Sequence, residues 1–355
     1  MFLTVCVIAY NEEQNINGIL ECIKNQDYDH NNMEVVLVDG ASTDNTRALM
    51  CEFALDNKDE FRRVVVLDNP KKTLPSGWNV ALREYKGDAI IKVDAHAVIP
   101  EDFVSKNVRV LETGEYICGG QRPNIIDKPT PFKETLLLAE SSMFGSSIAS
   151  YRNNPGKTYV KSLFHAAYRR EVFEKVGFFN EELVRTEDNE IHYRMRKAGY
   201  KLCFDPDIIS YQYTRSSLKA MLKQKYANGY WIGKTSKVCP KCLSIYHFVP
   251  FAFVSAIIAS GSVIGATGLA ECIKKRHNHT LGKGISALRK VTVVLTTVMW
   301  VLYALMASGM AAVSAFKAED KRNITNACLP VLFLLLHLSY GIGTIAGLMD
   351  KSKRG

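Results

Sequence analysis

Two stretches decide the fold: MEVVLVDGASTD at residues 33–44 and DAIIKVDAHA at residues 88–97. Each is a short run rich in β-branched residues that leads into an aspartate, Asp39 in the first and Asp94 in the second. Apolar runs of this length predict buried β-strands. Because open α/β folds bind their ligands at the carboxyl ends of parallel strands, we expect both carboxylates to line one binding edge.

The sequence around these runs alternates between strand and helix patterns. Strands are expected at 3–8, 33–38, 63–67 and 88–93, and helices at 16–23, 45–55 and 75–85. Strands joined by helical crossovers in this way predict an α/β sandwich with a mainly parallel sheet flanked by helices. The turn after the first strand reads AYNEE rather than a glycine fingerprint, which argues against dinucleotide-dependent hydride transfer.

The last third of the chain is much more apolar than the rest. The stretches 245–270, 291–316 and 327–349 contain no Asp, Glu, Lys or Arg, and each exceeds the roughly 20 helical residues that a hydrocarbon core requires. Buried core helices are the alternative, but three such runs predict a helical membrane region over 245–355.

The first ten residues lack a basic start and are interpreted as a strand rather than an export signal. We therefore expect an integral membrane protein whose amino-terminal domain is cytoplasmic, at the plasma membrane if the source is bacterial.

A basic segment separates the two parts of the chain. The net charge is +9, and no acidic residue occurs between Asp207 and Glu271, whereas lysines recur there. Apolar residues at helical spacing between these lysines predict that 213–244 is a basic amphipathic helix and linker lying on anionic membrane lipids. An ordinary helix packed on the soluble core is the alternative. Nucleic-acid binding is not expected, because the patch adjoins an apolar span and carries no recognised reading motif.

The charges also raise a question of topology. With a cytoplasmic amino-terminal domain, three full spans would place 271–290, which carries six Lys or Arg, on the outer side, against the positive-inside tendency. Either that tendency is overridden here, or 245–270 is re-entrant or lies in the interface.

Several motifs resemble family 2 glycosyltransferases of the GT-A fold, and among them the succinoglycan-biosynthesis type. They are AYNEEQNI (9–16), VVLVDGASTDNT (35–46), the Gly77-Trp78-Asn79 turn, KVDAHAVIPEDF (92–103), HAAYRREVFEKVG (165–177) and RTEDNEIHYRMRKAGY (185–200). The resemblance runs from about residue 2 to residue 231. It implies a nucleotide-diphospho-sugar transferase fold, with the catalytic domain over 1–212.

The resemblance also implies a set of donor and metal contacts. The residues expected to bind the donor nucleotide are Ala9, Tyr10, Glu12, Asp39, Asn79 and Asp94. Residues 94–96, Asp-Ala-His, stand where the family has the Asp-x-Asp signature that holds a divalent cation, Mn²⁺ or Mg²⁺. His96 departs from that signature, but polypeptide N-acetylgalactosaminyltransferases are similar in using Asp-x-His with manganese, and imidazole suits a transition metal better than magnesium. His165 is a candidate third ligand, with a purely structural histidine as the alternative.

An acidic pair, Glu187-Asp188, opens a predicted helix that continues to Lys197. Helix amino termini favour ionised carboxylates, so capping is one role for Asp188. The resemblance implies another, in which Asp188 is the catalytic general base, the ionised carboxylate that inverting transfer requires beside the acceptor hydroxyl. Glu187 would orient the acceptor or the base, with a solvated carboxylate as its alternative.

Acceptor contacts are expected on the basic helix and in the stretch 121–131. Processive relatives carry Gln-x-x-Arg-Trp on this helix, and the nearest match here is Gln224 with Trp231, seven residues apart. Trp231 would stack on the acceptor sugar or anchor the helix at the bilayer. The departure from the motif favours single additions over processive synthesis.

These features predict a metal-dependent inverting hexosyltransferase. It would move a hexose from a nucleotide-diphosphate sugar, expected to be UDP-linked, to a lipid-linked saccharide in exopolysaccharide or glycan assembly, within a polysaccharide-synthesis complex. A polyprenyl-phosphate sugar synthase of the same fold is the alternative. A non-catalytic sugar-nucleotide-binding scaffold subunit is an alternative of another class, supported only by His96.

Overall fold

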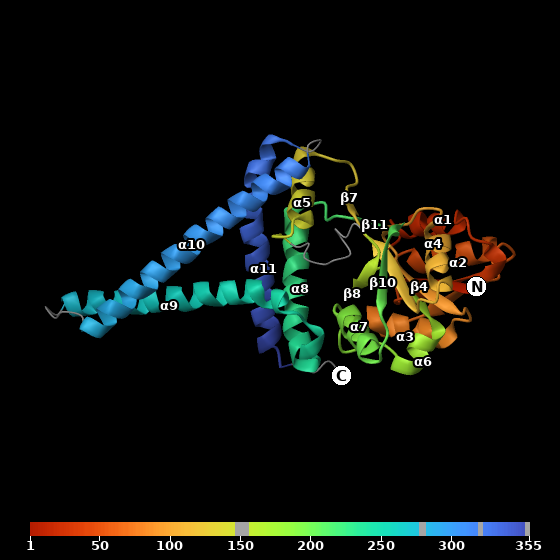
Figure 1. The fold of residues 1–355 in the computed structure, drawn as a ribbon, viewed down its shortest axis with the longest axis horizontal. Helices are drawn as coiled ribbons and strands as arrows, with labels where there is room; N and C mark the ends of the chain where they lie inside the picture. The colour runs from red at the N-terminus through yellow and green to blue at the C-terminus, as the bar shows by residue number, and fades with distance from the viewer. Residues whose placement is uncertain (146–155, 277–281, 319–321, 352–355) are drawn as a thin grey trace.

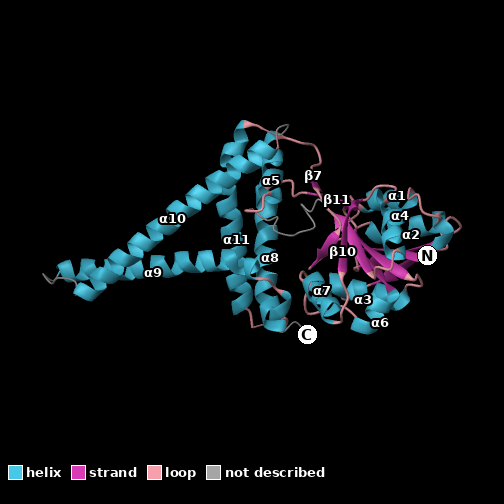
Figure 2. Ribbon diagram, in the orientation of Figure 1, coloured by secondary structure: helices cyan, strands magenta, loops and turns pink. Residues whose placement is uncertain are grey.

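The computed structural model describes residues 1–145, 156–276, 282–318 and 322–351. It has three regions (Figure 1): an amino-terminal α/β domain, a group of helices standing beside it, and a long two-helix arm that projects from the far side of that group. Strands occur within and next to the α/β domain, and the rest of the described chain is helical (Figure 2).

The α/β domain is built on an eight-stranded sheet in the order β3-β2-β1-β4-β9-β6-β10-β8. Its strands are β1 (Leu3–Ala9), β2 (Met33–Asp39), β3 (Arg63–Asp68), β4 (Ala89–Asp94), β6 (Ile117–Gln121), β8 (Thr158–Val160), β9 (Ala167–Arg169) and β10 (Leu202–Ile209). The strands β3, β2, β1 and β4 pair in parallel, as do β6 and β10. The predicted mainly parallel sheet is confirmed. The antiparallel β9 between β4 and β6, and the antiparallel edge strand β8, were not predicted.

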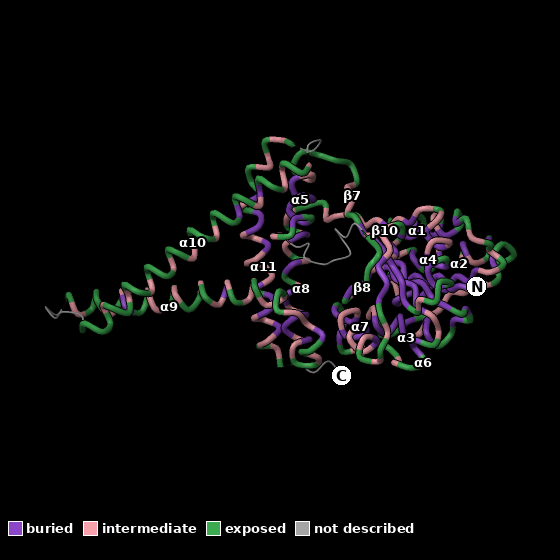
Figure 3. Tube along the Cα trace, in the orientation of Figure 1, coloured by how far each residue is buried: buried purple, intermediate pink, exposed green. Residues whose placement is uncertain are grey.

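Helices cover both faces of this sheet. They are α1 (Ile16–Lys24), α2 (Thr46–Asp56) and α4 (Phe103–Glu112) on one face, and α3 (Leu74–Glu84), α6 (Arg170–Val176) and α7 (Glu187–Lys197) on the other. Along β1, Val5 packs with Ile19 of α1, whereas the next residue, Cys6, packs with Trp78 of α3. Alternation along the strands thus fills two separate cores, and the buried residues concentrate there (Figure 3).

A second, small sheet follows β4 directly in the chain. Its order is β5-β11-β7, with β5 at Ala97–Val98, β7 at Asn124–Ile125 and β11 at Tyr211–Tyr213. It lies where the α/β domain meets the standing helices (Figure 1). The end of β4 therefore faces these helices.

The standing helices are α5 (Pro131–Ser141), α8 (Leu218–Val238) and α11 (Leu329–Met349). The arm consists of α9 (Val249–Arg276) and α10 (Lys283–Lys317). Short 3₁₀ segments are η1 (His30–Asn32), η3 (Pro240–Cys242), η4 (Ile245–Phe248) and η6 (Ile324–Cys328).

Three helical stretches are long and apolar enough to cross a membrane: Ile245–Arg276, Lys283–Lys317 and Ile324–Met349. They contain the three apolar runs predicted from the sequence. The helix α9 is continuous from Val249 to Arg276, which does not support the re-entrant alternative for 245–270.

The helices α8 and α11 pack closely and run parallel. A Cβ added to Gly229 of α8 would lie 1.9 Å from the carbonyl oxygen of Tyr340, and one added to Gly343 of α11 would lie 2.1 Å from that of Tyr226. Gly233 and Gly347, four residues further along each helix, make the same kind of contact. Paired glycines at four-residue spacing let two helix backbones approach directly.

One local prediction was wrong. Residues 77–79 were named a turn in the motif comparison, but they lie inside α3, which confirms the helix predicted at 75–85. The helix starts earlier because Thr73 caps it, accepting a hydrogen bond from the backbone N–H of Ser76, and Pro75 occupies its first turn.

Candidate active site

The site is built at the carboxyl end of β4. Lys92 and Asp94 are two residues apart on this strand, so their side chains extend from the same face of the sheet. The side chain of Lys92 is only 4% exposed. A lysine so deeply buried requires negative partners close by.

Those partners come from the amino terminus of α7. The Lys92 Nζ lies 2.9 Å from each carboxylate oxygen of Asp188 and 3.7 Å from Oε1 of Glu187. The N-cap position of α7 belongs to Thr186, and no side-chain capping bond forms there. Asp188 is thus held by Lys92 rather than by a capping bond, and both predicted catalytic carboxylates are brought to the end of β4.

The charges of this cluster reinforce one another. Burial lowers the pKa of Lys92, but the carboxylates of Asp188, Glu187 and Asp94 more than offset it and hold that pKa above its ordinary value. Burial, with the negative charge of Asp188, raises the pKa of Glu187. The site therefore stabilises a protonated Lys92 and disfavours a second negative charge beside Asp188.

His165 contacts Asp94 through the backbone of that residue. Its Nε2 accepts a hydrogen bond from the backbone N–H of Asp94 at 3.3 Å, and its Nδ1 lies 2.8 Å from Oγ of Ser210. The Nε2 is 3.7 Å from the Asp94 carboxylate, too far for a hydrogen bond. Burial lowers the pKa of His165, which agrees with a neutral ring that donates from Nδ1.

His96 faces a different partner. Its Nδ1 lies 3.3 Å from Oε1 of Glu12, and its Nε2 lies 3.4 Å from Nε2 of Gln212. The contact with Glu12 raises the pKa of His96. The pair joins a predicted donor-binding residue to a predicted metal ligand, across the ends of β1 and β4.

The side chains were tested for a fit to a divalent cation. Among the residues that the structure describes, no three His, Cys, Asp or Glu side chains converge as a metal cluster. Asp94 nevertheless fits one ligand position: burial raises its pKa, but His165, Lys92 and His96 together lower it well below the ordinary value, so it is ionised. His96 can add a nitrogen donor. His165 does not fit as a ligand, because its side chain is fully buried, whereas that of His96 is 28% exposed, and its Nε2 already accepts a hydrogen bond from the backbone N–H of Asp94.

Most of the residues predicted to bind the donor nucleotide lie at the carboxyl edge of the large sheet. Ala9 pairs with Asp39 across β1 and β2, and the Asp39 carboxylate accepts hydrogen bonds from the backbone N–H of Ser42. Tyr10, which follows Ala9, is 47% exposed and so available to a ligand.

Asn79 departs from this group. It is 2% exposed, and its side-chain amide bonds to the backbone of Phe179 and to Glu181. The arrangement gives Asn79 a role in tying α3 to the loop before α7, and none of these contacts supports donor binding.

The predicted acceptor residues lie on the face of α8 that meets α7. Asn228 of α8 accepts a hydrogen bond from Nη1 of Arg185 at 3.0 Å, and the hydroxyls of Thr235 and Thr186 are hydrogen-bonded. Positions 224, 228, 231 and 235 form one stripe of an α-helix. Gln224 and Trp231 therefore share the stripe that contacts the amino terminus of α7, although Trp231 itself is mostly buried.

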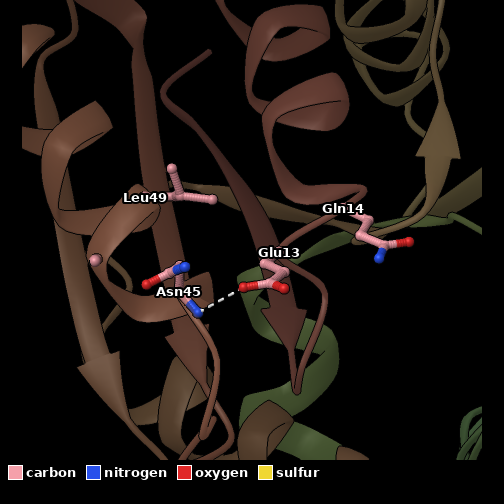
Figure 4. Close-up of a pocket in the computed structure, with 5 residues that line it drawn as sticks. Glu13, Gln14, Asn45 and Leu49 are labelled. Carbon is pink, nitrogen blue, oxygen red and sulfur yellow. Dashed lines mark hydrogen bonds between the residues drawn. The ribbon is translucent and has the colours of Figure 1, made fainter.

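A separate hollow of about 470 Å³ is lined by Glu13, Gln14, Asn45, Ala48 and Leu49. There the backbone N–H of Asn45 donates to the Glu13 carboxylate at 3.0 Å (Figure 4). None of the predicted site residues lines it. The cluster of Lys92, Glu187 and Asp188 is therefore separate from this hollow.

Sequence reasoning missed Lys92. The signal was present: a lysine interrupts the apolar strand DAIIKVD, and the two-residue spacing places it on the same face as Asp94. A buried charge of this kind needs a counter-ion, and the acidic pair at 187–188 was available in the sequence.

Three comparisons bear on this site. The model of the family described as "Glycosyl transferase family 2" matches residues 4–177. A dolichyl N-acetyl-alpha-D-glucosaminyl phosphate 3-beta-D-2,3-diacetamido-2,3-dideoxy-beta-D-glucuronosyltransferase of Methanococcus voltae is 26% identical over 265 residues, which is 73% of this chain and 80% of that protein. The succinoglycan biosynthesis protein ExoA of Rhizobium meliloti (strain 1021) is 28% identical over 230 residues, 63% of this chain and 67% of that protein.

A solved structure has the same fold. The mannosyltransferase PcManGT from Pyrobaculum calidifontis, in complex with GDP-Man and Mn²⁺, matches with a TM-score of 0.55 and 18% sequence identity. The match covers 99% of this chain and 88% of that chain. It extends through the α/β domain and the carboxy-terminal helices together.

Proposed function

Because the chain carries a family 2 glycosyltransferase domain with the GT-A fold, we propose that it is a metal-dependent inverting hexosyltransferase acting on a lipid-linked saccharide. The proposal rests on one observation above all, the contact of Lys92 with Asp188. Since Lys92 and Asp94 share a face of β4, this contact supports a base role for Asp188 close to the proposed cation ligand Asp94.

In the proposed reaction, Asp188 accepts the proton of an acceptor hydroxyl as its oxygen attacks the anomeric carbon of the donor. The new bond joins that carbon to the acceptor oxygen, and the bond to the diphosphate oxygen breaks. A single displacement inverts the anomeric centre. Lys92 orients the Asp188 carboxylate throughout, and Glu187, whose pKa is raised, is placed to hold the acceptor by hydrogen bonding.

Asp94 and His96 are the residues proposed to hold the divalent cation. When bound, Mn²⁺ or Mg²⁺ acts as a Lewis acid that neutralises charge developing on the leaving diphosphate. The proposal gains support from PcManGT, whose structure contains Mn²⁺. An imidazole donor favours Mn²⁺ over Mg²⁺.

We propose a UDP-linked hexose as the donor, with Tyr10, Glu12 and Asp39 binding the nucleoside. The exposed ring of Tyr10 at the carboxyl end of β1 supports base stacking. The acceptor is proposed to be a saccharide on a lipid carrier, because the acceptor stripe of α8 adjoins the apolar helices. The M. voltae relative is named for a dolichyl-linked sugar phosphate acceptor, which agrees with this choice.

The catalytic domain is proposed to lie in the cytoplasm, at the plasma membrane if the source is bacterial, with basic α8 against anionic lipids and in contact with a polysaccharide-synthesis complex. The lysines that recur along α8, with no acidic residue between Asp207 and Glu271, support that side.

The test uses the full chain in nanodiscs, a panel of UDP- and GDP-linked sugars, and either a lipid-linked saccharide or the lipid phosphate alone. Mass spectrometry identifies the product, and NMR gives the anomeric configuration. Transfer to the saccharide with inversion is expected. Transfer to lipid phosphate alone would identify a polyprenyl-phosphate sugar synthase. Equal donor turnover by the wild type and Asp188→Asn would remove the base assignment, and donor binding without any turnover by the wild type would identify the scaffold alternative.

A further inference from the structure

The three apolar stretches are not equivalent in their surroundings. In the most apolar part of Ile324–Met349, 39% of the residues are buried within the protein, against 6% in each of the other two. The exposed residues of α11 are Val331, Ile342 and Met349. Spacings of 11 and 7 residues place all three on a single stripe. One face of α11 is therefore open, whereas the arm is open on most sides.

The orientation of α11 is fixed by α8. The glycine contacts hold the two helices parallel along their length, Ser339 donates a hydrogen bond to the carbonyl oxygen of Leu222 at 2.8 Å, and Asp350 lies 3.4 Å from Lys234. The helix α11 therefore has the same orientation relative to the bilayer as α8.

The α/β domain in turn restricts α8. Arg185 and Thr186, which precede the catalytic carboxylates, bond to Asn228 and Thr235 in the middle and near the end of α8. The α/β domain lies alongside α8 (Figure 1). A polar domain of this kind cannot enter hydrocarbon, so a helix that it flanks lengthwise cannot cross the bilayer.

The arm of α9 and α10 lies away from the α/β domain, unlike α11, and is long enough to cross a bilayer. It leaves the standing helices on the side away from the α/β domain (Figure 1). Beyond Val254, the last strongly buried residue near its base, α9 continues for about 22 residues, which at about 1.5 Å per residue is about 33 Å. This length matches a hydrocarbon core of about 30 Å. Near the tip of the arm, Glu271 of α9 forms an ion pair with Arg289 of α10.

We propose that, of the described segments, only the α9–α10 arm crosses the bilayer, while α8 and α11 lie in the plane of its surface. The stripe of Val331, Ile342 and Met349 then dips into the acyl chains, as an in-plane amphipathic helix does. Both ends of α11 lie on the side of the catalytic domain. This places Lys351 together with Lys317 and Arg322 on that side, while the six Lys or Arg of 271–290 lie on the other side, against the positive-inside tendency, so the orientation rests on the packing and not on these charges.

Labelling with a membrane-impermeant maleimide in sided vesicles tests this orientation. The full chain is used with Cys22, Cys51, Cys239, Cys272 and Cys328 replaced by serine, because the other four cysteines are buried. Single cysteines are then introduced as Lys58→Cys in the catalytic domain, Arg276→Cys at the arm tip, and Lys351→Cys after α11. We expect Lys351→Cys to label from the same side as Lys58→Cys, and Arg276→Cys from the opposite side. Labelling of Lys351→Cys only from the side of Arg276→Cys would overturn the proposal.

A depth measurement provides an independent check if any labelling variant fails to fold. Spin labels at Val331→Cys, Ile342→Cys and Met349→Cys should report the same shallow depth from oxygen and polar relaxants. A steep change in depth between positions 331 and 349 would show that α11 spans. Neither measurement depends on sugar transfer, so the topology and the proposed activity can fail separately.

Discussion

The ammonium nitrogen of Lys92 lies 2.9 Å from both carboxylate oxygens of Asp188, although the two residues are 96 positions apart in the chain. This ion pair joins the sheet edge to the helix that carries the proposed base. It also connects the chemistry to folding, because a charge so deeply buried is costly without its partner.

Replacement of Asp188 by asparagine should remove the base while keeping the shape of the side chain. We expect kcat to fall by about 10²- to 10⁴-fold, the usual contribution of a positioned general base, with little change in donor KM. Steady-state kinetics on the full chain measure both. The control is Glu182→Gln, an exposed carboxylate in the loop before α7, which should leave both constants unchanged. A fall in kcat of less than tenfold for Asp188→Asn would rule out the base role.

Lys92→Met should destabilise the chain and lower kcat. It leaves Asp188 and Glu187 without their shared cation, and losing one partner of a buried pair costs about 3 kcal/mol. Denaturant unfolding in detergent gives the stability. The matched control is Lys71→Met, which removes an exposed ion pair with Glu181 and should cost less than about 1 kcal/mol.

A double-mutant cycle tests whether Lys92 acts through Asp188. In the Asp188→Asn background, Lys92→Met should lower the stability less than it does in the wild type and should hardly lower kcat further. The reason is that the negative charge of Asp188, which Lys92 neutralises, is already absent. Additive effects on both quantities would show that Lys92 does not act through Asp188.

The cation preference should follow His96. In the wild type, removal of divalent cations by a chelator should abolish transfer, and Mn²⁺ should restore it better than Mg²⁺, because imidazole suits a transition metal. His96→Asp supplies an oxygen ligand and should shift the preference toward Mg²⁺. His165→Gln should lower activity with both cations alike, since His165 contacts Asp94 through hydrogen bonding alone. A preference that changes with His165→Gln and not with His96→Asp would reverse the ligand assignment.

Gly229→Ala should destabilise the helical region. The added Cβ would lie 1.9 Å from the carbonyl oxygen of Tyr340, so α8 and α11 must separate, at a cost of about 1–3 kcal/mol. Thermal unfolding in detergent measures the shift. Gly265→Ala, in the arm, has nothing within 4 Å of its new Cβ and serves as the control. Equal melting temperatures for the two variants would contradict the close packing.

The chain should lose stability on acidification through His192. Burial lowers the pKa of this histidine from 6.5 to about 4, and its ring lies between Ser162 and Tyr168. The neutral ring of His192 in the folded chain stabilises it fully above pH 6.5. This stabilisation is lost as the pH falls toward 4, because the unfolded chain takes up the proton first. The loss approaches about 3 kcal/mol. Unfolding measured from pH 7.5 to 4.5 should show a steeper decline for the wild type than for His192→Gln, and parallel curves would refute the assignment.

The parallel half of the sheet, β1 to β4, could be predicted because each of these strands is a short run rich in apolar residues, whereas β10, which contains Asp205, Pro206 and Asp207, was not predicted. Asp39 and Asp94 closed such runs, and their positions at the strand ends followed from local sequence alone. The contact of Lys92 with Asp188 could not be predicted in the same way, since it depends on how α7 packs against β4 across 96 residues. Asn79 shows the opposite case: a motif match placed it at the donor, whereas buried hydrogen bonds to Phe179 occupy its amide.

The carboxy-terminal helices show a similar limit. Hydropathy marked 327–349 as a span, but it carries no information on which helix lies beside it. The glycines that join α11 to α8 are spread over two segments more than a hundred residues apart. Only the folded arrangement brings them together.

The hydroxyl of Thr186 is hydrogen-bonded to that of Thr235, so the residue before the proposed catalytic pair is attached to α8. A helix that lies on lipid headgroups responds to their packing and to the lateral pressure of the bilayer. A tilt of α8 would be transmitted to the neighbouring carboxylates through this bond and through that of Arg185 with Asn228. Turnover in vesicles of graded acyl-chain length would then vary with membrane thickness, even though no lipid tail reaches the sugar.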